Sequence, residues 1–260
     1  MITRVALTIA GSDSSGGAGI QADLRTFAAL GFHGLSVVTA VTSQTASAVR
    51  HVFPTPQEVV AAQLGAVLED FAPDACKIGM VPTASCAEVI AERLRAAELR
   101  NVVVDPVIAA GDGTPLVAED AWRAVAEKLF CLAAMVTPNL AEAGALLDGD
   151  PPRNAEEMAQ AAQEIAKRYG AAAVLVTGGH LEGEAATDVL YDGKSVRQFP
   201  ANRVATAGRV RGTGCMLSSA IACNLAYGMA AQRAVSEAKE YVLRRIISAR
   251  RVGRSHAVIG

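Results

Sequence analysis

The sequence of 260 residues predicts an α/β protein: a three-layer, doubly wound, mostly parallel sheet with helices on both faces. Short β-branched runs recur along the chain and are apolar at consecutive positions, which is typical of strands covered on both sides. The segments between them place apolar residues three and four positions apart, as in amphipathic helices. Apolar residues make up 51% of the chain, enough for a large core. We therefore expect one domain over residues 1–260.

The predicted strands alternate with helical segments in chain order. They are RVALTIA (4–10), GLSVVTAV (34–41), DACKIGMV (74–81), NVVVDPVI (101–108), AAMVTPN (133–139) and AAVLVTGG (172–179). Helical spacing is clear in QADLRTFAALG (21–31), PQEVVAAQLGAVLEDF (56–71) and NAEEMAQAAQEIAKRYG (154–170). Pro56 suits the beginning of a helix, and Gly170 suits an end. In such a sheet, ligands gather at the carboxyl ends of the strands.

The last part of the chain predicts a hairpin and then helix. Residues 187–200 alternate in polarity around Asp192-Gly193, a hairpin turn signal, and would add an antiparallel edge. From Thr213 the pattern is helical almost to Arg251. The arginines near this end are expected on a solvated helix terminus, where they complement the dipole.

Charge and cysteine usage exclude several classes of protein. A formal net charge of −2 gives no global attraction for nucleic acid or an anionic membrane. No apolar stretch reaches spanning length and the first residues do not form a secretory signal, so we expect a cytoplasmic protein. The five cysteines show no C-x-x-C pair, and the four histidines show no metal spacing. The pattern thus suggests neither a disulfide framework nor a zinc site.

A glycine-rich stretch, AGSDSSGGAG (10–19), follows the first predicted strand. Its glycines have the spacing of a phosphate-binding loop, but Gly17 stands where the lysine should be, and Asp13 would repel phosphate. A dinucleotide fingerprint also fits weakly, because the expected acidic residue about twenty positions later is absent. With Asp13 and Asp23 nearby, the loop favours a polar, uncharged ligand. The alternative is that the glycines only turn the strand into its helix.

A second glycine loop has the opposite charge. No acidic residue lies between Asp192 and Glu237, while basic residues precede GTGC, namely Lys194, Arg197, Arg203, Arg209 and Arg211. Gly212, Thr213, Gly214 and Cys215 lead into a helix, whose free amides and dipole would hold a transferring phosphoryl group. The same field would lower the pKa of Cys215, so this thiol could accept a proton. Alternatively, Cys215 is a small residue chosen for packing.

Oxygen-bearing side chains form a third cluster at predicted strand ends. Asp105 follows VVV, and Asn139 and Glu142 lie three apart at a helix start, hence on one face. Together they could hold Mg²⁺ against nucleotide phosphates. The alternative is a capping box, with Asn139 as the N-cap. Both interpretations can hold together.

In chain order, these motifs resemble the ribokinase superfamily, and within it the bacterial hydroxymethylpyrimidine/phosphomethylpyrimidine kinases of thiamine synthesis. The similarity runs from about Val5 through the helix after Cys215. The matching stretches are ALTIAGSDSSGGAGIQADLRTFAALG, AVTSQT, KIGM, VVVDPVI, VTPNLAEAGALL, GGHLEG and GTGC.

The resemblance implies an ATP- and Mg²⁺-dependent kinase that forms a homodimer. The acceptor pyrimidine would contact Gly11, Asp23, Gln44, Met80, Val107 and Cys215, with its ring amine and nitrogen paired to Asp23 and Gln44. The ATP phosphates and Mg²⁺ would lie towards Asp105, Asn139 and Glu142. The backbone from Gly212 to Cys215 would stabilise the transferred group. Cys215 would stand where sugar kinases have an aspartate base.

The chain departs from the family pattern near the phosphates. Ala110-Gly111-Asp112 stands where Lys-Ser-Gly is usual, and Thr177-Gly178-Gly179-His180 stands where Lys-Gly-Gly-His is usual. Arg211 replaces a histidine. We expect Thr177, Gly179 and Arg209 on the nucleotide, and Arg209 or Arg211 in part of the role of the missing lysines.

Other functions are compatible with the same residues. Pyridoxal or pyridoxine kinase is an enzyme alternative, because its acceptor is also a heteroaromatic ring with a hydroxymethyl group. A non-catalytic pyrimidine-binding protein is the alternative from a different class, because two lysines are missing.

Overall fold

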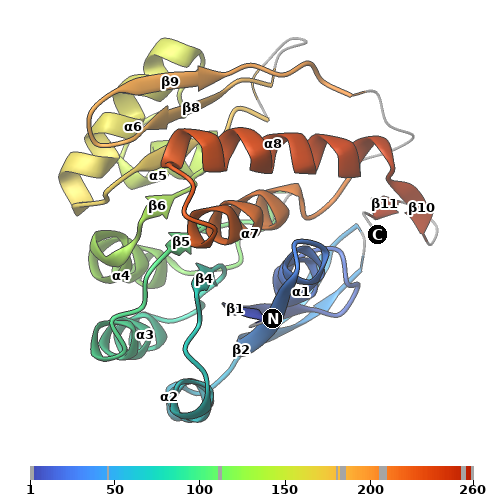
Figure 1. Ribbon diagram of the computed structural model, residues 1–260, viewed down its shortest axis with the longest axis vertical. Coiled ribbons are helices and arrows are strands. Elements are labelled where there is room, and N and C mark those ends of the chain that lie inside the picture. The colour runs from blue at the N-terminus through green and yellow to red at the C-terminus, as the bar shows by residue number, and fades with distance from the viewer. Residues whose placement is uncertain are drawn as a thin grey trace.

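The computed structural model describes residues 3–45, 47–110, 113–179, 181, 186–204, 210–252 and 256–258. Within these residues, strands alternate with helices along most of the chain (Figure 1). The strands are β1 (Arg4–Asp13), β2 (Phe32–Gln44), β3 (Val49–Pro54), β4 (Ala75–Ile78), β5 (Val102–Val104), β6 (Met135–Val136), β7 (Val174–Val176), β8 (Asp188–Tyr191), β9 (Val196–Phe199), β10 (Arg250–Val252) and β11 (His256–Val258).

The described strands form a nine-stranded sheet in the order β3-β2-β1-β4-β5-β6-β7-β8-β9. From β2 to β7 all neighbouring pairs are parallel, and β3, β8 and β9 pair antiparallel at the two edges. The predicted α/β fold and its antiparallel hairpin are therefore confirmed. The edge strand β3 was not predicted, because its residues are half-buried or exposed and leave no apolar run.

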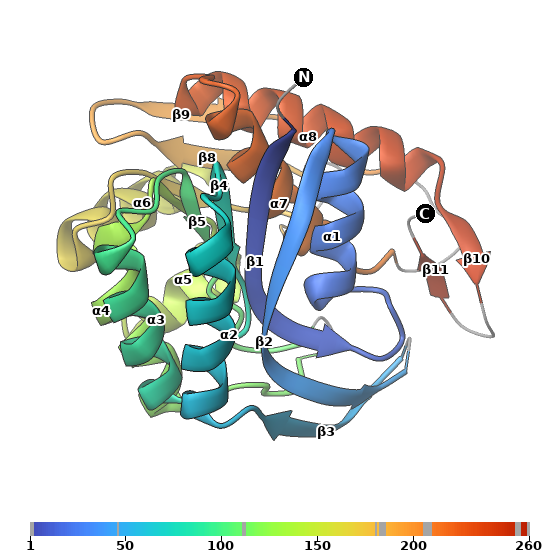
Figure 2. The same cartoon turned by 60° about the horizontal axis from the view of Figure 1, so that its bottom comes forward.

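Helices cover both faces of the sheet, as Figures 1 and 2 show. They are α1 (Gly19–Ala29), α2 (Gln57–Asp70), α3 (Ala84–Ala96), α4 (Glu119–Leu129), α5 (Leu140–Leu146), α6 (Ala155–Tyr169), α7 (Thr213–Ala226) and α8 (Ala231–Ile247), with a short 3-10 helix at Phe130–Leu132. As predicted, α2 begins immediately after Pro56. Similarly, α6 ends at Gly170, whose φ of +71° is the left-handed conformation that glycine adopts without strain.

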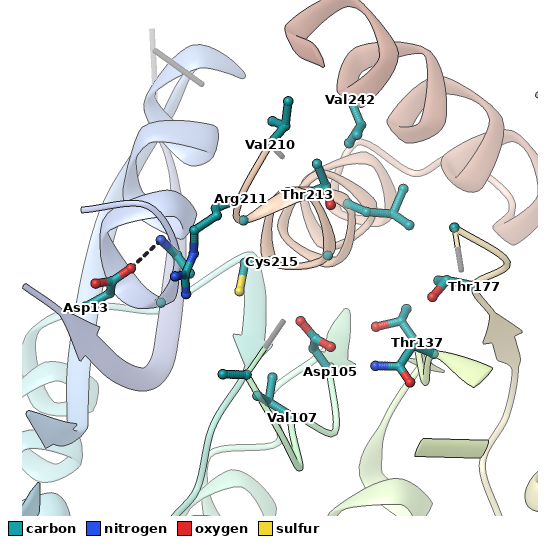
Figure 3. A pocket seen from close by; sticks show the side chains of 18 of the residues that line it. Asp13, Asp105, Val107, Thr137, Thr177, Val210, Arg211, Thr213, Cys215 and Val242 are labelled. Carbon is teal, nitrogen blue, oxygen red and sulfur yellow. Dashed lines mark hydrogen bonds between the residues drawn. The ribbon is translucent and has the colours of Figure 1, made fainter. Parts of the chain in front are cut away.

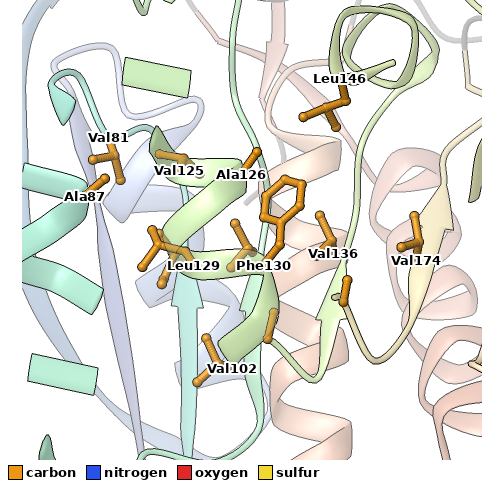
Figure 4. Packing of buried hydrophobic residues seen from close by; sticks show 14 of the residues in the cluster. Val81, Ala87, Val102, Val125, Ala126, Leu129, Phe130, Val136, Leu146 and Val174 are labelled. Carbon is orange, nitrogen blue, oxygen red and sulfur yellow. The ribbon is translucent and has the colours of Figure 1, made fainter. Parts of the chain in front are cut away.

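Two apolar layers separate these helices from the sheet. Leu7 and Ile9 of β1 belong to the layer under α2 to α6, whereas Ala6 belongs to the layer under α1, α7 and α8. This alternation follows from the two-residue period of a strand. In the first layer, side chains of α4 such as Leu129, together with Phe130, pack against the strands (Figure 4).

The predicted late helix is interrupted. It divides into α7 and α8 at a turn where Gly228 has a φ of +82°, and α8 ends at Ile247. Arg244 and Arg245 occupy the last turn of α8, as the dipole favours, but Arg250 begins β10. The segment is therefore helical almost to Arg251, as predicted, but as two helices and not one. Among the described residues, no helix combines the length and apolar character needed to cross a bilayer.

The parallel strands end at one common edge of the sheet. The pairing of β1 with β2 shifts register between Ala10 and Gly11, so the last residues of β1 form an irregular continuation of the strand. Such irregularities occur where a strand must re-aim its residues next to a site. The segments after β1, β4, β5, β6 and β7 therefore converge at this edge.

Candidate active site

A cavity of about 880 Å³ opens at this edge of the sheet. Its wall is formed by the first glycine loop, the ends of β2, β4, β5 and β6, the turn after β7, and the beginning of α7. One side of α8 contributes apolar residues, namely Val242, Leu243 and Ile246. Figure 3 shows side chains of these different segments pointing into the same space.

The first glycine loop is held by its own aspartate. The Asp13 carboxylate accepts hydrogen bonds from the backbone of Ser15 and Ala18, at 2.8 and 2.9 Å, and from the Ser15 hydroxyl. Gly19 has a φ of +57°, and a side chain there would meet the Gly11 carbonyl oxygen. Asp13 thus shapes the loop, and it also lines the cavity.

The predicted acceptor residues lie together on this side of the cavity. Gly11, Gln44, Met80 and Val107 all line it. A side chain at position 11 would overlap the Met80 methyl group at 2.4 Å, so the absence of one gives Met80 its place. Ser14 bonds to both backbone groups of Gln44 at 2.9 Å, which joins the loop to the end of β2.

Asp23 behaves differently from the other predicted residues. Its side chain is fully buried and is not part of the cavity wall. Both of its carboxylate oxygens lie 3.0 Å from the Lys77 ammonium nitrogen. The direct contact with the acceptor amine that the resemblance implies is therefore absent from this geometry, and it is Lys77 that reaches the cavity from this pair.

Sequence reasoning assigned no role to Lys77. The signal was present, because this is a charged residue in the middle of ACKI, a strand buried at all four positions. Burial alone would lower the pKa of Lys77, but the charges around it, Asp23 first, outweigh burial and raise it. Lys77 is thus a permanent cation in the wall of the cavity.

The start of α7 opens into the cavity. Gly212, Thr213, Gly214 and Cys215 all line it, and no side chain caps the helix start. The first turn contains no acidic residue. Gly212 has a φ of +77°, and an added side chain would lie 2.1 Å from the Gly17 carbonyl oxygen. The two glycine loops therefore touch, and the free amides of α7 face the space beside the first loop.

The thiol of Cys215 points into the cavity above Asp105 and Val107 (Figure 3). Burial raises its pKa to about 12, opposed first by the charge of Lys77, while the carboxylates of Asp23 and Asp105 add to the rise. The lowered pKa expected from the sequence is therefore wrong. Desolvation and two nearby carboxylates outweigh the helix dipole at this position.

The basic run before GTGC is dispersed in space. Arg197 bonds to Gln232, and Lys194 lies in the β8–β9 turn, so neither contributes to the cavity wall. Arg203 and Arg211 do line it. Arg211 donates to the Thr45 carbonyl oxygen at 3.2 Å, which places it near the end of β2. Arg209 lies outside the described residues.

The oxygen-rich patch of the third motif is assembled as predicted. Asp105, Asn139 and Glu142 line one part of the wall. Asn139 and Glu142 also form the alternative, a capping box, in which the Asn139 side chain accepts from the Glu142 amide and Glu142 accepts from the Asn139 amide. Burial, and then the charge of Asp105, raise the pKa of Glu142 to about 8.

A hydroxyl group beside this patch is unsatisfied. Thr137 is 5% exposed, and among the described residues its Oγ1 is the one buried side-chain oxygen or nitrogen without a hydrogen-bond partner. It lines the cavity, and Figure 3 shows it near Asp105. Buried polar groups are rarely left unpaired, so an orphan in a cavity wall indicates a ligand atom opposite it.

The turn after β7 is held in place by the Asp188 side chain. Thr177 and Gly179 line the cavity, and the Gly178 amide donates to Asp188 at 2.8 Å. The other Asp188 oxygen accepts from Lys239 of α8 at 2.5 Å. Sequence reasoning missed this pair, because its two residues lie 51 positions apart.

Comparison with known proteins places this arrangement among vitamin kinases. A sequence profile of the family described as Phosphomethylpyrimidine kinase matches residues 13–260. The hydroxymethylpyrimidine/phosphomethylpyrimidine kinase of Rhizobium meliloti (strain 1021) is 48% identical over 251 residues, which cover 96% of this chain and 93% of the relative.

Two solved structures are similar over nearly the whole chain. The phosphomethylpyrimidine kinase from Clostridium difficile 630 has a TM-score of 0.81 and 38% identity, covering 93% of this chain and 98% of that one. The ADP complex of Bacillus subtilis pyridoxal kinase has a TM-score of 0.91 and 35% identity, covering 99% and 97%.

Proposed function

Because the chain belongs to the phosphomethylpyrimidine kinase family, we propose that it phosphorylates 4-amino-5-hydroxymethyl-2-methylpyrimidine and its monophosphate with ATP, for thiamine biosynthesis. The observation that carries this proposal is the order of groups along one cavity wall. Figure 3 shows Asp13 of the first glycine loop at one end and the hydroxyl-bearing Thr137 and Thr177 at the other. Cys215 in the first turn of α7 lies between them. Residues 1–260 act as one kinase domain in this proposal.

The acceptor ring occupies the end of the cavity lined by Gly11, Gln44, Met80 and Val107. The Gln44 side chain pairs with polar atoms of the ring, and Met80 and Val107 contact its faces. Arg211 lies at the same end and supplies a cation where a monophosphorylated acceptor would carry its phosphate. The ATP phosphates extend along Asn139, Thr177 and Gly179.

Transfer takes place at the start of α7. The amides of Gly212, Thr213, Gly214 and Cys215 stabilise the charge of the migrating phosphoryl group, since preorganised donors act strongly in a dry site. The Cys215 thiol group, as thiolate, accepts the proton of the attacking hydroxyl. Phosphoryl transfer depends mainly on positioning and charge neutralisation. A thiol that is only rarely ionised at neutral pH can therefore serve as the general base.

The residues near Asp105 fit a magnesium ion. Burial is the first cause of the raised pKa values of Asp105 and Glu142, so the ionised carboxylates lack full compensation from the protein, and a bound cation would favour their ionised form. No group of three or more histidine, cysteine or acidic side chains suited to a metal occurs in the described part of the chain. Phosphate and water oxygens would therefore complete the shell. Bound there, the ion would neutralise phosphate charge.

The proposal is tested by mass spectrometry of products formed with MgATP and each of three acceptors: the pyrimidine alcohol, its monophosphate and pyridoxal. We expect phosphorylation of both pyrimidines. Exclusive phosphorylation of pyridoxal would contradict the proposal and favour the second candidate, pyridoxal kinase. That candidate is supported by the high TM-score to the Bacillus subtilis enzyme, against the higher identity to the Rhizobium meliloti relative. Thermal stabilisation by a pyrimidine without product would favour a non-catalytic binding protein. A homodimer and a cytoplasmic location stay predictions.

Replacement of Thr137 with valine is expected to have opposite effects on stability and on nucleotide use. Valine has nearly the same shape but removes the unsatisfied hydroxyl, so the melting temperature should rise. The KM for ATP should increase about 2- to 10-fold, because one hydrogen bond to the nucleotide is lost. Thermal denaturation and steady-state kinetics measure the two effects. An unchanged KM would show that Thr137 does not contact the nucleotide.

The Glu142→Gln variant is expected to be more stable than wild type at alkaline pH in metal-free buffer. The folded pKa of Glu142, raised by burial to about 8, exceeds its unfolded value. The folded state therefore binds more protons, and its stability falls as the pH rises from roughly 4.5 to 8. Glutamine does not titrate and still accepts at the capping box. Melting temperatures of the two proteins should diverge over this range, and parallel curves would contradict the assignment.

A further inference from the structure

Lys77 is a buried cation whose position the sequence alone does not explain. Its side chain is fully buried and lies directly behind the surface of the cavity, as part of its wall. Lysine is almost never fully buried unless it is paired. The ammonium group occupies space left by Gly79, where an added side chain would lie 2.8 Å from Nζ. The chain thus keeps room for this charge at the bottom of the cavity.

On the side away from the cavity, Lys77 is paired with Asp23, and every oxygen of this carboxylate has hydrogen-bond partners. Asp23 receives Lys77 at 3.0 Å, the Thr8 hydroxyl at 2.7 Å and the Ser219 hydroxyl at 2.8 Å. The donors come from β4, β1 and α7, so three elements hold the carboxylate that α1 carries. Asp23 therefore acts as an anchor for the ammonium group and has no free oxygen to present to a ligand.

The other side of Lys77 faces the reacting groups. Its Nζ lies 3.9 Å from Oδ2 of Asp105, an oxygen that also accepts from the Ser218 hydroxyl at 3.3 Å. Asp105 is 7% exposed and lines the cavity. The charge of Lys77 also acts on Cys215. The charge of Lys77 thus acts on both Asp105, at the proposed nucleotide end of the cavity, and Cys215, at the proposed acceptor end.

Stability alone does not account for an ion pair at this place. Replacement of buried ion pairs by neutral residues of similar size is often neutral or stabilising, so such a pair is weak evidence of a stabilising role. A lysine that is anchored on one side and directed at the cavity on the other has the arrangement of a preorganised electrostatic group.

We propose that Lys77 is a positioning residue for phosphoryl transfer, which holds the Asp105 carboxylate in place and offsets the negative charge that develops beside Cys215. The inference rests on the kinase function proposed above. Lys77 does not exchange a proton in this role, and no bond to it forms or breaks. Its contribution is a fixed positive charge 3.9 Å from the Asp105 carboxylate.

The test separates this role from folding by removing the pair as a unit. Lys77→Met alone leaves Asp23 buried and unpaired, so it should unfold more easily. Lys77→Met combined with Asp23→Asn removes both charges and should restore the melting temperature to near that of wild type. Asp23→Asn alone and Thr8→Val serve as matched controls. Thr8→Val removes a hydrogen bond to the same carboxylate and should lower the melting temperature but change kcat less than about twofold.

We expect the double variant to be folded and to have a kcat about 100-fold below that of wild type, with both KM values within about threefold. Recovery of kcat in the double variant would overturn the proposal, since the pair would then be structural. Asp23→Asn alone keeps the Lys77 charge but removes its anchor, so kcat should fall in this variant too. A wild-type kcat in Asp23→Asn would overturn the proposal, because the position of the ammonium group would then not matter. Wild type is assayed with whichever acceptor it phosphorylates best. An inactive wild type would refute the kinase function itself.

Discussion

Replacing Cys215 with alanine is expected to lower kcat about 10²- to 10³-fold while KM and the melting temperature stay near their wild-type values. The thiol points into the cavity, and it contributes to the reaction only when it takes the proton of the acceptor hydroxyl. Because burial raises its pKa to about 12, little thiolate exists at neutral pH. The wild-type kcat should therefore rise with pH, nearly tenfold per unit below this pKa.

Kinetics from pH 6.5 to 9 and isothermal titration with the acceptor check this expectation. Cys215→Ser is the informative companion variant, since a hydroxyl of similar size binds similarly but ionises less readily. Full activity of Cys215→Ala would reject the assigned role. A flat pH profile in wild type would show that proton removal by the thiol does not limit turnover.

Replacing Gly212 with alanine is expected to abolish most activity by separating the two glycine loops. The φ of +77° at this position disfavours any side chain, and the methyl group would overlap the Gly17 carbonyl oxygen at 2.1 Å. The overlap involves backbone on both sides, so a rotamer change cannot relieve it. We expect kcat/KM to fall at least about 100-fold, because small displacements of catalytic groups have effects of this size.

Two other glycines provide controls for this variant. At Gly214 an added side chain meets nothing within 4 Å, so Gly214→Ala should fold normally while its methyl group enters the space of the transferred phosphate. At Gly65 in α2 the surroundings are also open, and alanine should stabilise the helix by about 0.5–1 kcal/mol. Circular dichroism melting curves and kinetics compare the three. A Gly212→Ala protein with normal turnover would contradict the contact between the loops.

The sequence predicted those elements of the fold whose signals lie within a few neighbouring residues. The buried strands, the start of α2 and the end at Gly170 follow from apolar runs, proline and glycine, which act within a few residues. The edge strand β3 could not be predicted, because it depends on pairing with β2 and not on its own polarity. The break before α8 depends on one glycine within a helical pattern.

In the candidate site, too, the sequence predicted what local motifs determine and missed what depends on distant residues. Motifs placed Gly11, Gln44, Cys215 and the capping-box residues at one cavity, because strand ends converge in a parallel sheet. The pairing of Lys77 with Asp23 connects residues 54 positions apart, and no spacing rule predicts it. The expected thiolate failed for a related reason: a pKa depends on everything that surrounds a group, including carboxylates from distant segments.

The capping box at the start of α5 links the backbone amide of Asn139 to ligand binding in the cavity. The Asn139 amide donates to the Glu142 carboxylate, and the same carboxylate lies in the cavity wall where we propose that the ATP phosphates bind. Any ligand that draws Glu142 outward must loosen this bond, and a ligand that completes the wall must tighten it. Amide hydrogen exchange at Asn139 would therefore register occupancy of the cavity without a label on either substrate.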